Sequence, residues 1–132
     1  MAEKILENLD GRNVVCLRGE LGAGKTTFVS GMGQFLGIKK IVSPTFILIR
    51  KHLIKKTTAH LKYKILWHVD LYRLETIKEV LDLGLTDLWQ SKTNLVVIEW
   101  PEKITHLLPE HRVEVKIKSL STDTREFEVD YL

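Results

Sequence analysis

The chain has 132 residues, of which 44% are hydrophobic and 28% charged, as is typical of one folded domain. This composition excludes a disordered chain, and no apolar run approaches the ~20 residues that a membrane-spanning helix needs. The net charge of +3 is compatible with an acidic ligand or RNA without requiring either. Cys16 is the only cysteine, which excludes an internal disulfide. Because the N-terminus also lacks a signal-peptide pattern, we expect a cytoplasmic protein with no membrane contact.

The first half of the sequence predicts alternating helices and strands. Apolar residues spaced at i, i+3, i+4 and i+7 predict a short helix over residues 2–9, and residues 14–17 suit a buried strand. A glycine-rich loop comes next, and an amphipathic helix is predicted over residues 25–37. Beyond it, residues 46–50 and 64–70 predict two strands joined by a long basic loop.

The second half predicts a shorter helix and then mainly strands. Thr76 and Glu79 have the spacing of a capping box, which predicts a helix that Gly84 ends. The later patterns predict a buried strand, a short helix and an antiparallel hairpin, over residues 95–98, 101–108, and 111–117 with 125–131. Together the elements predict one domain over residues 1–132. Its fold would be an α/β, three-layer sandwich like that of P-loop NTPases, with a mixed, partly antiparallel central sheet.

Residues 19–26 match the pattern G-x-x-x-x-G-K-[ST] in full. In such a loop the glycines let backbone N–H groups surround a phosphate, while the lysine, here Lys25, reaches the β- and γ-phosphates. The hydroxyl of Thr26 would bind magnesium, and the helix N-terminus would favour negative charge. A chance match in a chain of this length is on the order of one in a few hundred. The motif therefore predicts binding of ATP with Mg²⁺.

Two acidic residues follow predicted strands and are candidates for the metal and the chemistry. Asp70 ends the run 65–69, and Glu99 ends the run 95–98. Ligands of parallel sheets bind at the carboxyl ends of strands, so both carboxylates are expected beside the loop. Either could bind magnesium directly or through water, or could orient the attacking water.

Several other features leave two interpretations open. Thr45, after Ser-Pro, suits a rigid turn or a switch loop that senses the γ-phosphate. Trp100, directly after Glu99, suits the core or the edge of the site. The five histidines show no zinc-site spacing, and His68 is expected to be a packed strand residue. A basic cluster suits either a solvated hairpin or a surface that docks RNA or an acidic partner: Arg50, Lys51, Lys55, Lys56, Lys62 and Lys64.

Four motifs in this order resemble the TsaE (YjeE) family. They are GELGAGKTT at 19–27, SPTF at 43–46, HVDLYRL at 68–74 and IEWPE at 98–102. The resemblance covers nearly the whole chain and is more specific than the P-loop motif alone. The family consists of bacterial ATPases required for threonylcarbamoyladenosine modification of tRNA. They work with the TsaB–TsaD complex, so the resemblance implies that complex as partner and tRNA reached through it.

The resemblance also implies roles for individual residues. Asp70 and Glu99 would be catalytic, and Thr26, Glu99 and Asp70 would serve the magnesium. The nucleotide would contact Leu21, Gly22, Ala23, Gly24, Lys25, Thr26, Thr27, Thr45 and Trp100. The chain would be a Mg²⁺-dependent ATPase that is slow without its partners, since no arginine finger is evident. Two alternatives are a P-loop kinase of a small molecule and a nucleotide-gated binding module.

Overall fold

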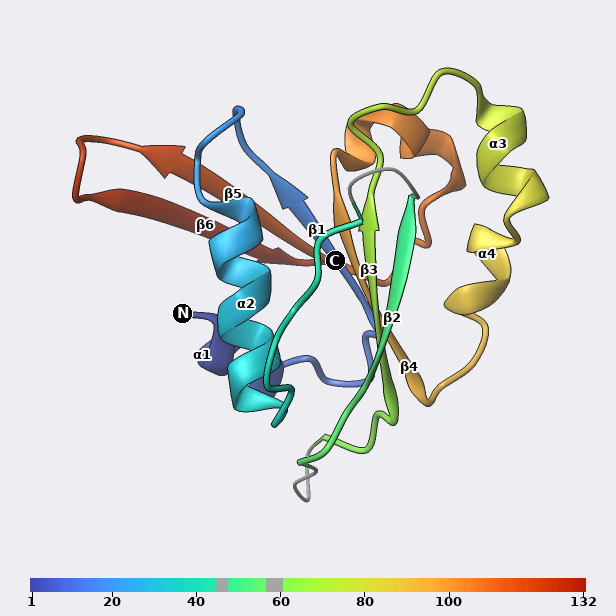
Figure 1. The fold of residues 1–132 in the computed structure, drawn as a ribbon, viewed down its shortest axis with the longest axis horizontal. Helices are drawn as coiled ribbons and strands as arrows, with labels where there is room; N and C mark the ends of the chain where they lie inside the picture. The colour runs from blue at the N-terminus through green and yellow to red at the C-terminus, as the bar shows by residue number, and fades with distance from the viewer. Residues whose placement is uncertain (45–47, 57–60) are drawn as a thin grey trace.

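A computed structural model describes residues 1–44, 48–56 and 61–132. Within these ranges six strands form one mixed sheet in the order β2-β3-β4-β1-β5-β6 (Figure 1). The strands are β1 (Val14–Arg18), β2 (Ile49–Leu53), β3 (Ile65–Asp70), β4 (Asn94–Glu99), β5 (Val113–Ser119) and β6 (Arg125–Tyr131). The helices are α1 (Ala2–Glu7), α2 (Lys25–Phe35), α3 (Ile77–Asp82), α4 (Leu85–Leu88) and the 3₁₀ helix η1 (Pro101–Leu107).

The sheet lies between two helical layers, each of which buries an apolar face of it. Helices α1 and α2 cover one face, while α3, α4 and η1 cover the other (Figure 1). Alternate residues of β1 point to opposite layers, so Val15 and Leu17 join the α1–α2 core and Val14 and Cys16 join the other. No helix in the described ranges is long and apolar enough to cross a membrane. The expected layered α/β fold with a mixed, partly antiparallel sheet is confirmed.

Most predicted elements form, and the exceptions are short or lie at an edge of the sheet. The strand predicted over 46–50 corresponds to β2, at Ile49–Leu53, so residues 51–53 belong to a strand and not to the loop. Residues 46 and 47 of that prediction lie outside the described residues. Its ends are set by antiparallel pairing with β3. The helix predicted to stop at Gly84 is followed by a second one, α4. The helix expected over 101–108 is η1, a 3₁₀ helix with a kink at Ile104.

Parallel pairing brings three strand ends to one edge of the sheet. Strand β1 pairs in parallel with β4, and β4 pairs in parallel with β3. In this register Leu17 lies opposite Glu99, and Glu99 lies opposite Asp70. The glycine-rich loop begins directly after β1, so it starts beside both carboxylates. Among the described residues, the glycine-rich loop and the carboxylates of Asp70 and Glu99 therefore lie together at the carboxyl ends of these strands.

The start of the loop is anchored by an ion cluster on β1 and β5. Arg18 Nε donates a 2.6 Å hydrogen bond to Glu114 Oε2, and Arg112 Nε donates one of 2.7 Å to Glu114 Oε1. Burial works to raise the pKa of Glu114, but the hydrogen bonds from both guanidinium groups outweigh it and keep that pKa below its usual range. Next along the chain, a Cβ on Gly19 would lie 2.7 Å from the carbonyl oxygen of Ile117. The loop therefore leaves β1 against the backbone of β5, where only glycine fits.

We expect Glu114→Gln to lower the free energy of unfolding at neutral pH by about 1–2 kcal/mol, because two charge-assisted hydrogen bonds are weakened. Since the folded-state pKa is depressed, this contribution is present above the ordinary carboxyl pKa and is lost as the pH falls through the folded value. Urea unfolding of both proteins from about pH 7 to about pH 3 measures the difference. Glu126→Gln, on the exposed side of β6, is the matched control. A difference that stays constant with pH would contradict the account.

Candidate functional site

The glycine-rich loop turns directly into the first residue of α2. Gly24 has φ +107°, a left-handed conformation that suits glycine, and its carbonyl accepts the hydrogen bond of the Phe28 N–H. The loop is tightened by a 3.0 Å hydrogen bond from the Ala23 N–H to the Glu20 carbonyl. The N-terminus of α2, with its free N–H groups, therefore opens onto the space between the loop and the strand ends. Such a helix end attracts anions.

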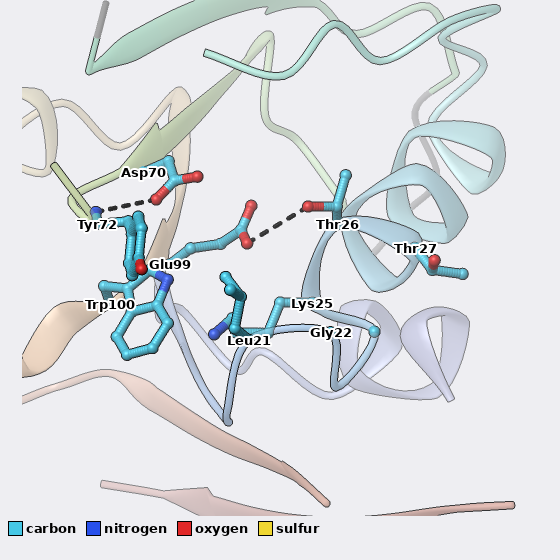
Figure 2. Close-up of a pocket in the computed structure, with 10 residues that line it drawn as sticks. Leu21, Gly22, Lys25, Thr26, Thr27, Asp70, Tyr72, Glu99 and Trp100 are labelled. Carbon is cyan, nitrogen blue, oxygen red and sulfur yellow. Dashed lines mark hydrogen bonds between the residues drawn. The ribbon is translucent and has the colours of Figure 1, made fainter. Parts of the chain in front are cut away.

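That space is a cavity of about 290 Å³. It is bounded on one side by the loop and α2, and on the other by residues at and just beyond the ends of β3 and β4 (Figure 2). It is lined by Leu21, Gly22, Gly24, Lys25, Thr26, Thr27, Asp70, Tyr72, Glu99 and Trp100. A cationic group, two carboxylates and a hydroxyl thus converge on one small volume.

The ammonium group of Lys25 is enclosed by the loop and by Trp100. Lys25 is 5% exposed, and its Nζ donates to the carbonyl oxygen of Gly19 at 2.5 Å. The same Nζ lies 3.7 Å from the centre of the Trp100 ring, within range of a cation–π interaction. Burial lowers the pKa of Lys25, while the nearby charge of Glu99 acts in the opposite direction. The structure thus directs a buried cation toward the loop side of the cavity.

Glu99 is a buried carboxylate with a partner on each oxygen. It is 3% exposed, and its Oε1 accepts a hydrogen bond of 3.5 Å from the Thr26 hydroxyl across the cavity (Figure 2). Its Oε2 lies 2.5 Å from Nε2 of His68, which is fully buried on β3. Because His68 occupies one oxygen, the other is directed at Thr26. The imidazole therefore fixes the orientation of the carboxylate.

Asp70 lies beside Glu99 at the end of β3. Its Oδ1 accepts a 3.0 Å hydrogen bond from the Tyr72 N–H, which orients the carboxyl group (Figure 2). Burial raises the pKa of Asp70; the Tyr72 hydrogen bond opposes this shift, and the charge of Glu99 adds to it. A carboxylate with a raised pKa is a better proton acceptor than an exposed one.

Trp100 adopts an unusual backbone conformation at the edge of the cavity. Its φ is 61° and its ψ 49°, a left-handed geometry that is an outlier for a bulky residue. Such strain costs on the order of 1–3 kcal/mol and is concentrated at functional sites. The conformation places the indole against the Tyr72 ring, with 5.0 Å between ring centres, and over Lys25. Trp100 is partly buried, lines the cavity and packs against the neighbouring core, so each of the two expectations describes part of its position.

The cavity brings together most of the residues predicted for the site. Ala23 is the exception on the loop, since it is buried and its carbonyl accepts a 3.0 Å hydrogen bond from Arg125 Nε. Thr27 lines the cavity, but its side chain points away from the two carboxylates (Figure 2). Thr45 lies outside the described residues. Within those residues, no three His, Cys, Asp or Glu side chains gather closely enough to bind a metal ion by themselves.

Three contacts at the site were not predicted from the sequence. His68 was expected to be only a packed strand residue, yet it contacts Glu99. The two-residue period of a strand offered a signal, because it places His68 on the same face as Asp70. Tyr72, just after β3, lines the cavity, and Arg125, at the start of β6, binds the loop from outside. No local pattern points to Arg125, since its loop partner is 102 residues away.

Comparison with known proteins places this chain in a family. Residues 1–127 match the family model described as threonylcarbamoyl adenosine biosynthesis protein TsaE. The tRNA threonylcarbamoyladenosine biosynthesis protein TsaE of Treponema pallidum is 37% identical over 122 residues, which are 92% of this chain and 84% of that protein. The TsaE protein of Bacillus subtilis is 39% identical over 115 residues, which are 86% of this chain and 66% of that protein.

A solved structure agrees with these matches. The crystal structure of YdiB from Bacillus subtilis superposes with a TM-score of 0.66 at 28% sequence identity, covering 96% of this chain and 75% of that one. The match extends over the sheet and both helical layers, so it includes the elements that form the cavity. The chain belongs to the TsaE family of threonylcarbamoyladenosine biosynthesis proteins.

Proposed function

We propose that residues 1–132 form a single P-loop ATPase domain that binds ATP with Mg²⁺ and acts with the TsaB–TsaD complex in the cytoplasm. Its task would be to support threonylcarbamoyladenosine modification of tRNA, as the names of its relatives suggest. The observation that carries the proposal is the contact between Thr26 and Glu99. A loop hydroxyl and a strand-end carboxylate face each other at 3.5 Å, at the N-terminus of α2.

The loop residues fit a triphosphate. Gly22 and Gly24 line the cavity without side chains that would exclude a phosphate, and the N-terminus of α2 offers free N–H groups. The Lys25 ammonium, which now contacts the Gly19 carbonyl and the Trp100 ring, would pair with the phosphate oxygens. Trp100 and Leu21 would border the nucleotide, and Leu21 is 72% exposed beside the cavity, where a ligand could cover it.

The oxygen donors also fit a magnesium ion. Thr26 and Glu99 would bind it, with Asp70 as a direct ligand or through water, and all three supply the hard oxygens that Mg²⁺ prefers. When bound, the ion would neutralise negative charge on the phosphates. The described residues offer no complete protein cage for a metal. The ion is therefore expected to depend on the phosphates of the nucleotide as additional ligands.

The two carboxylates suit different roles, one in metal binding and the other in activation of water. Glu99 is fixed by His68 and faces Thr26, which suits a metal ligand. Asp70 has a pKa raised by burial and a hydrogen-bonded orientation, which suits a group that orients water and accepts its proton. No arginine is among the described residues that line the cavity. A missing charge-stabilising group would make hydrolysis slow until a partner completes the site.

We expect Lys25→Ala to weaken ATP binding by at least about 30-fold, equivalent to roughly 2 kcal/mol, because the phosphates lose their buried cationic partner. Isothermal titration calorimetry with ATP and Mg²⁺ measures the change. Lys103→Ala is the control, since Lys103 donates to the Leu74 carbonyl and does not line the cavity. Equal ATP affinity of Lys25→Ala and the unsubstituted protein would rule out the assigned loop function.

We expect Asp70→Asn to lower kcat by about 10- to 100-fold with little change in ATP affinity, since the substitution removes a proton acceptor and keeps the shape of the side chain.

Glu99→Gln should instead raise the Mg²⁺ concentration needed for half-maximal activity as well as slow hydrolysis. His68→Gln should resemble a weaker Glu99→Gln, because it loosens the carboxylate. Phosphate release measured against ATP and Mg²⁺ concentration separates these effects. Parent rates in both carboxylate variants would show that the catalytic assignment is wrong.

We expect slow phosphate release by the purified chain alone and an increase of at least about 10-fold when TsaB–TsaD from the same organism is added, because the partner completes the site. The assay also decides between the alternatives. A phosphorylated small-molecule acceptor in place of free phosphate would identify a kinase. Full tRNA modification by Asp70→Asn would identify a binding module whose hydrolysis is dispensable.

A further inference from the structure

Positive charge is segregated within the chain. Residues 21–69 contain nine Lys and Arg residues and no Asp or Glu, so all 17 acidic residues lie outside this range. The remainder of the chain contains 11 Lys and Arg residues and is therefore net negative. The overall charge of +3 conceals this division, since the two parts nearly cancel. A surface built from residues 21–69 is consequently more basic than the composition indicates.

Backbone contacts gather most of these lysines at one end of the sheet. The N–H groups of Lys55 and Lys56 both donate 3.0 Å hydrogen bonds to the Leu36 carbonyl at the end of α2. A Cβ on Gly37 would lie 2.8 Å from Lys56 Cγ, which shows how closely the two segments approach. The Ile54 N–H donates to the Lys64 carbonyl at 2.9 Å. We call the resulting surface the basic end, made of Lys39, Lys40, Lys55, Lys56, Lys62 and Lys64.

All six lysines of the basic end are exposed. Lys62 and Lys64 alternate with Leu61 and Tyr63, whose burial directs the two lysines outward. Among the described residues, no lysine of the basic end forms an ion pair with an acidic residue. Asp10, in the turn before β1, pairs with Arg12 at 3.9 Å and not with one of these lysines. The ammonium groups are therefore available to an external anion.

The basic end lies opposite the nucleotide cavity. Helix α2 begins with Lys25, which lines the cavity, and its C-cap residue Leu36 accepts the hydrogen bonds of Lys55 and Lys56 at the other end of the helix. Strand β3 runs from the Lys64 end to Asp70 at the cavity. The lysines are thus too far along the sheet to contact a nucleotide in the cavity, which is lined by other residues. Some other anion must be their ligand if they bind one.

We propose that the basic end is a direct RNA-binding surface that contacts the phosphate backbone. Its cations are all lysines, which bind phosphate as point charges, whereas protein interfaces are depleted in lysine and enriched in aromatic residues and arginine. Val42 and Leu53 are the two large hydrophobic residues that are exposed in the described parts of 37–64, which is little apolar area for a protein interface. The choice of RNA over DNA rests on the proposed function, while the surface itself does not.

The test is binding of the full chain to unmodified tRNA, measured by fluorescence anisotropy over a range of KCl concentrations. With about four lysine–phosphate contacts, the plot of log K against log salt should have a slope near −3, a roughly 50- to 100-fold loss between 50 and 200 mM. Lys55→Glu with Lys56→Glu should weaken binding at least about 10-fold at low salt. ATP affinity of this double variant should stay unchanged, which separates failure of this proposal from failure of the proposed function.

The matched control is Lys78→Glu with Lys103→Glu on α3 and η1. Both double variants change the formal net charge from +3 to −1. Equal weakening by both would show a general charge effect and overturn the proposal, as would absent tRNA binding or a slope shallower than about −1. Tighter binding to a DNA hairpin of equal length would overturn the RNA assignment. Unchanged tRNA binding by Lys55→Glu with Lys56→Glu, together with lost capture of TsaB–TsaD, would assign the surface to a protein partner instead.

Discussion

The site depends on one carboxylate, Glu99, that is buried at the end of a central strand. An ionised group in such a place must be paired, because its desolvation costs several kcal/mol or more. Glu99 is paired on both oxygens, by His68 and by Thr26, and the Lys25 ammonium adds a favourable charge. Three side chains, two from the start of α2 and one from β3, thereby interact with this one group at the end of β4. Under the proposed function, a Mg²⁺ ion held by Thr26 and Glu99 would add a further favourable charge beside this carboxylate.

Parallel pairing makes this arrangement available. Because β1, β4 and β3 run in the same direction, their carboxyl ends lie at one edge, and the loop after β1 meets the acids that end the other two strands. The strand β5 has a supporting function, since Glu114 fixes Arg18 and the Ile117 backbone lies against Gly19. The β5–β6 hairpin adds Arg125, which binds the Ala23 carbonyl. The loop is thus supported on its outer side by elements that do not line the cavity.

Sequence patterns predicted the features of this protein that depend on interactions between residues close together in the chain. The glycine spacing of the loop, the capping box at Thr76 and the strand-end positions of Asp70 and Glu99 follow from rules that act over a few residues. The family resemblance, confirmed by the comparisons, added the function. Whether Thr45 belongs to a switch loop stays a prediction.

The features that sequence reasoning missed depend on register or on distant contacts. The ends of β2 are set by its pairing with β3, and α4 is too short to show a periodicity. The contact between His68 and Glu99 requires the offset between β3 and β4. Four lysines of the basic end were visible in the sequence as a cluster, but Lys39 and Lys40 join them because the Leu36 carbonyl accepts hydrogen bonds from Lys55 and Lys56, about 20 residues later. Such information is absent from any window of the sequence.

The enclosure of Lys25 has a consequence for how a ligand leaves. The Lys25 ammonium is paired with the Gly19 carbonyl and lies over the Trp100 ring. Under the proposed function, a phosphate would displace these partners, and its affinity would reflect the difference in free energy between the two pairings. When the phosphate leaves, the carbonyl and the indole would again pair with the ammonium. Such an exchange would spare the site an unpaired buried cation during product release, a step that limits turnover in many enzymes.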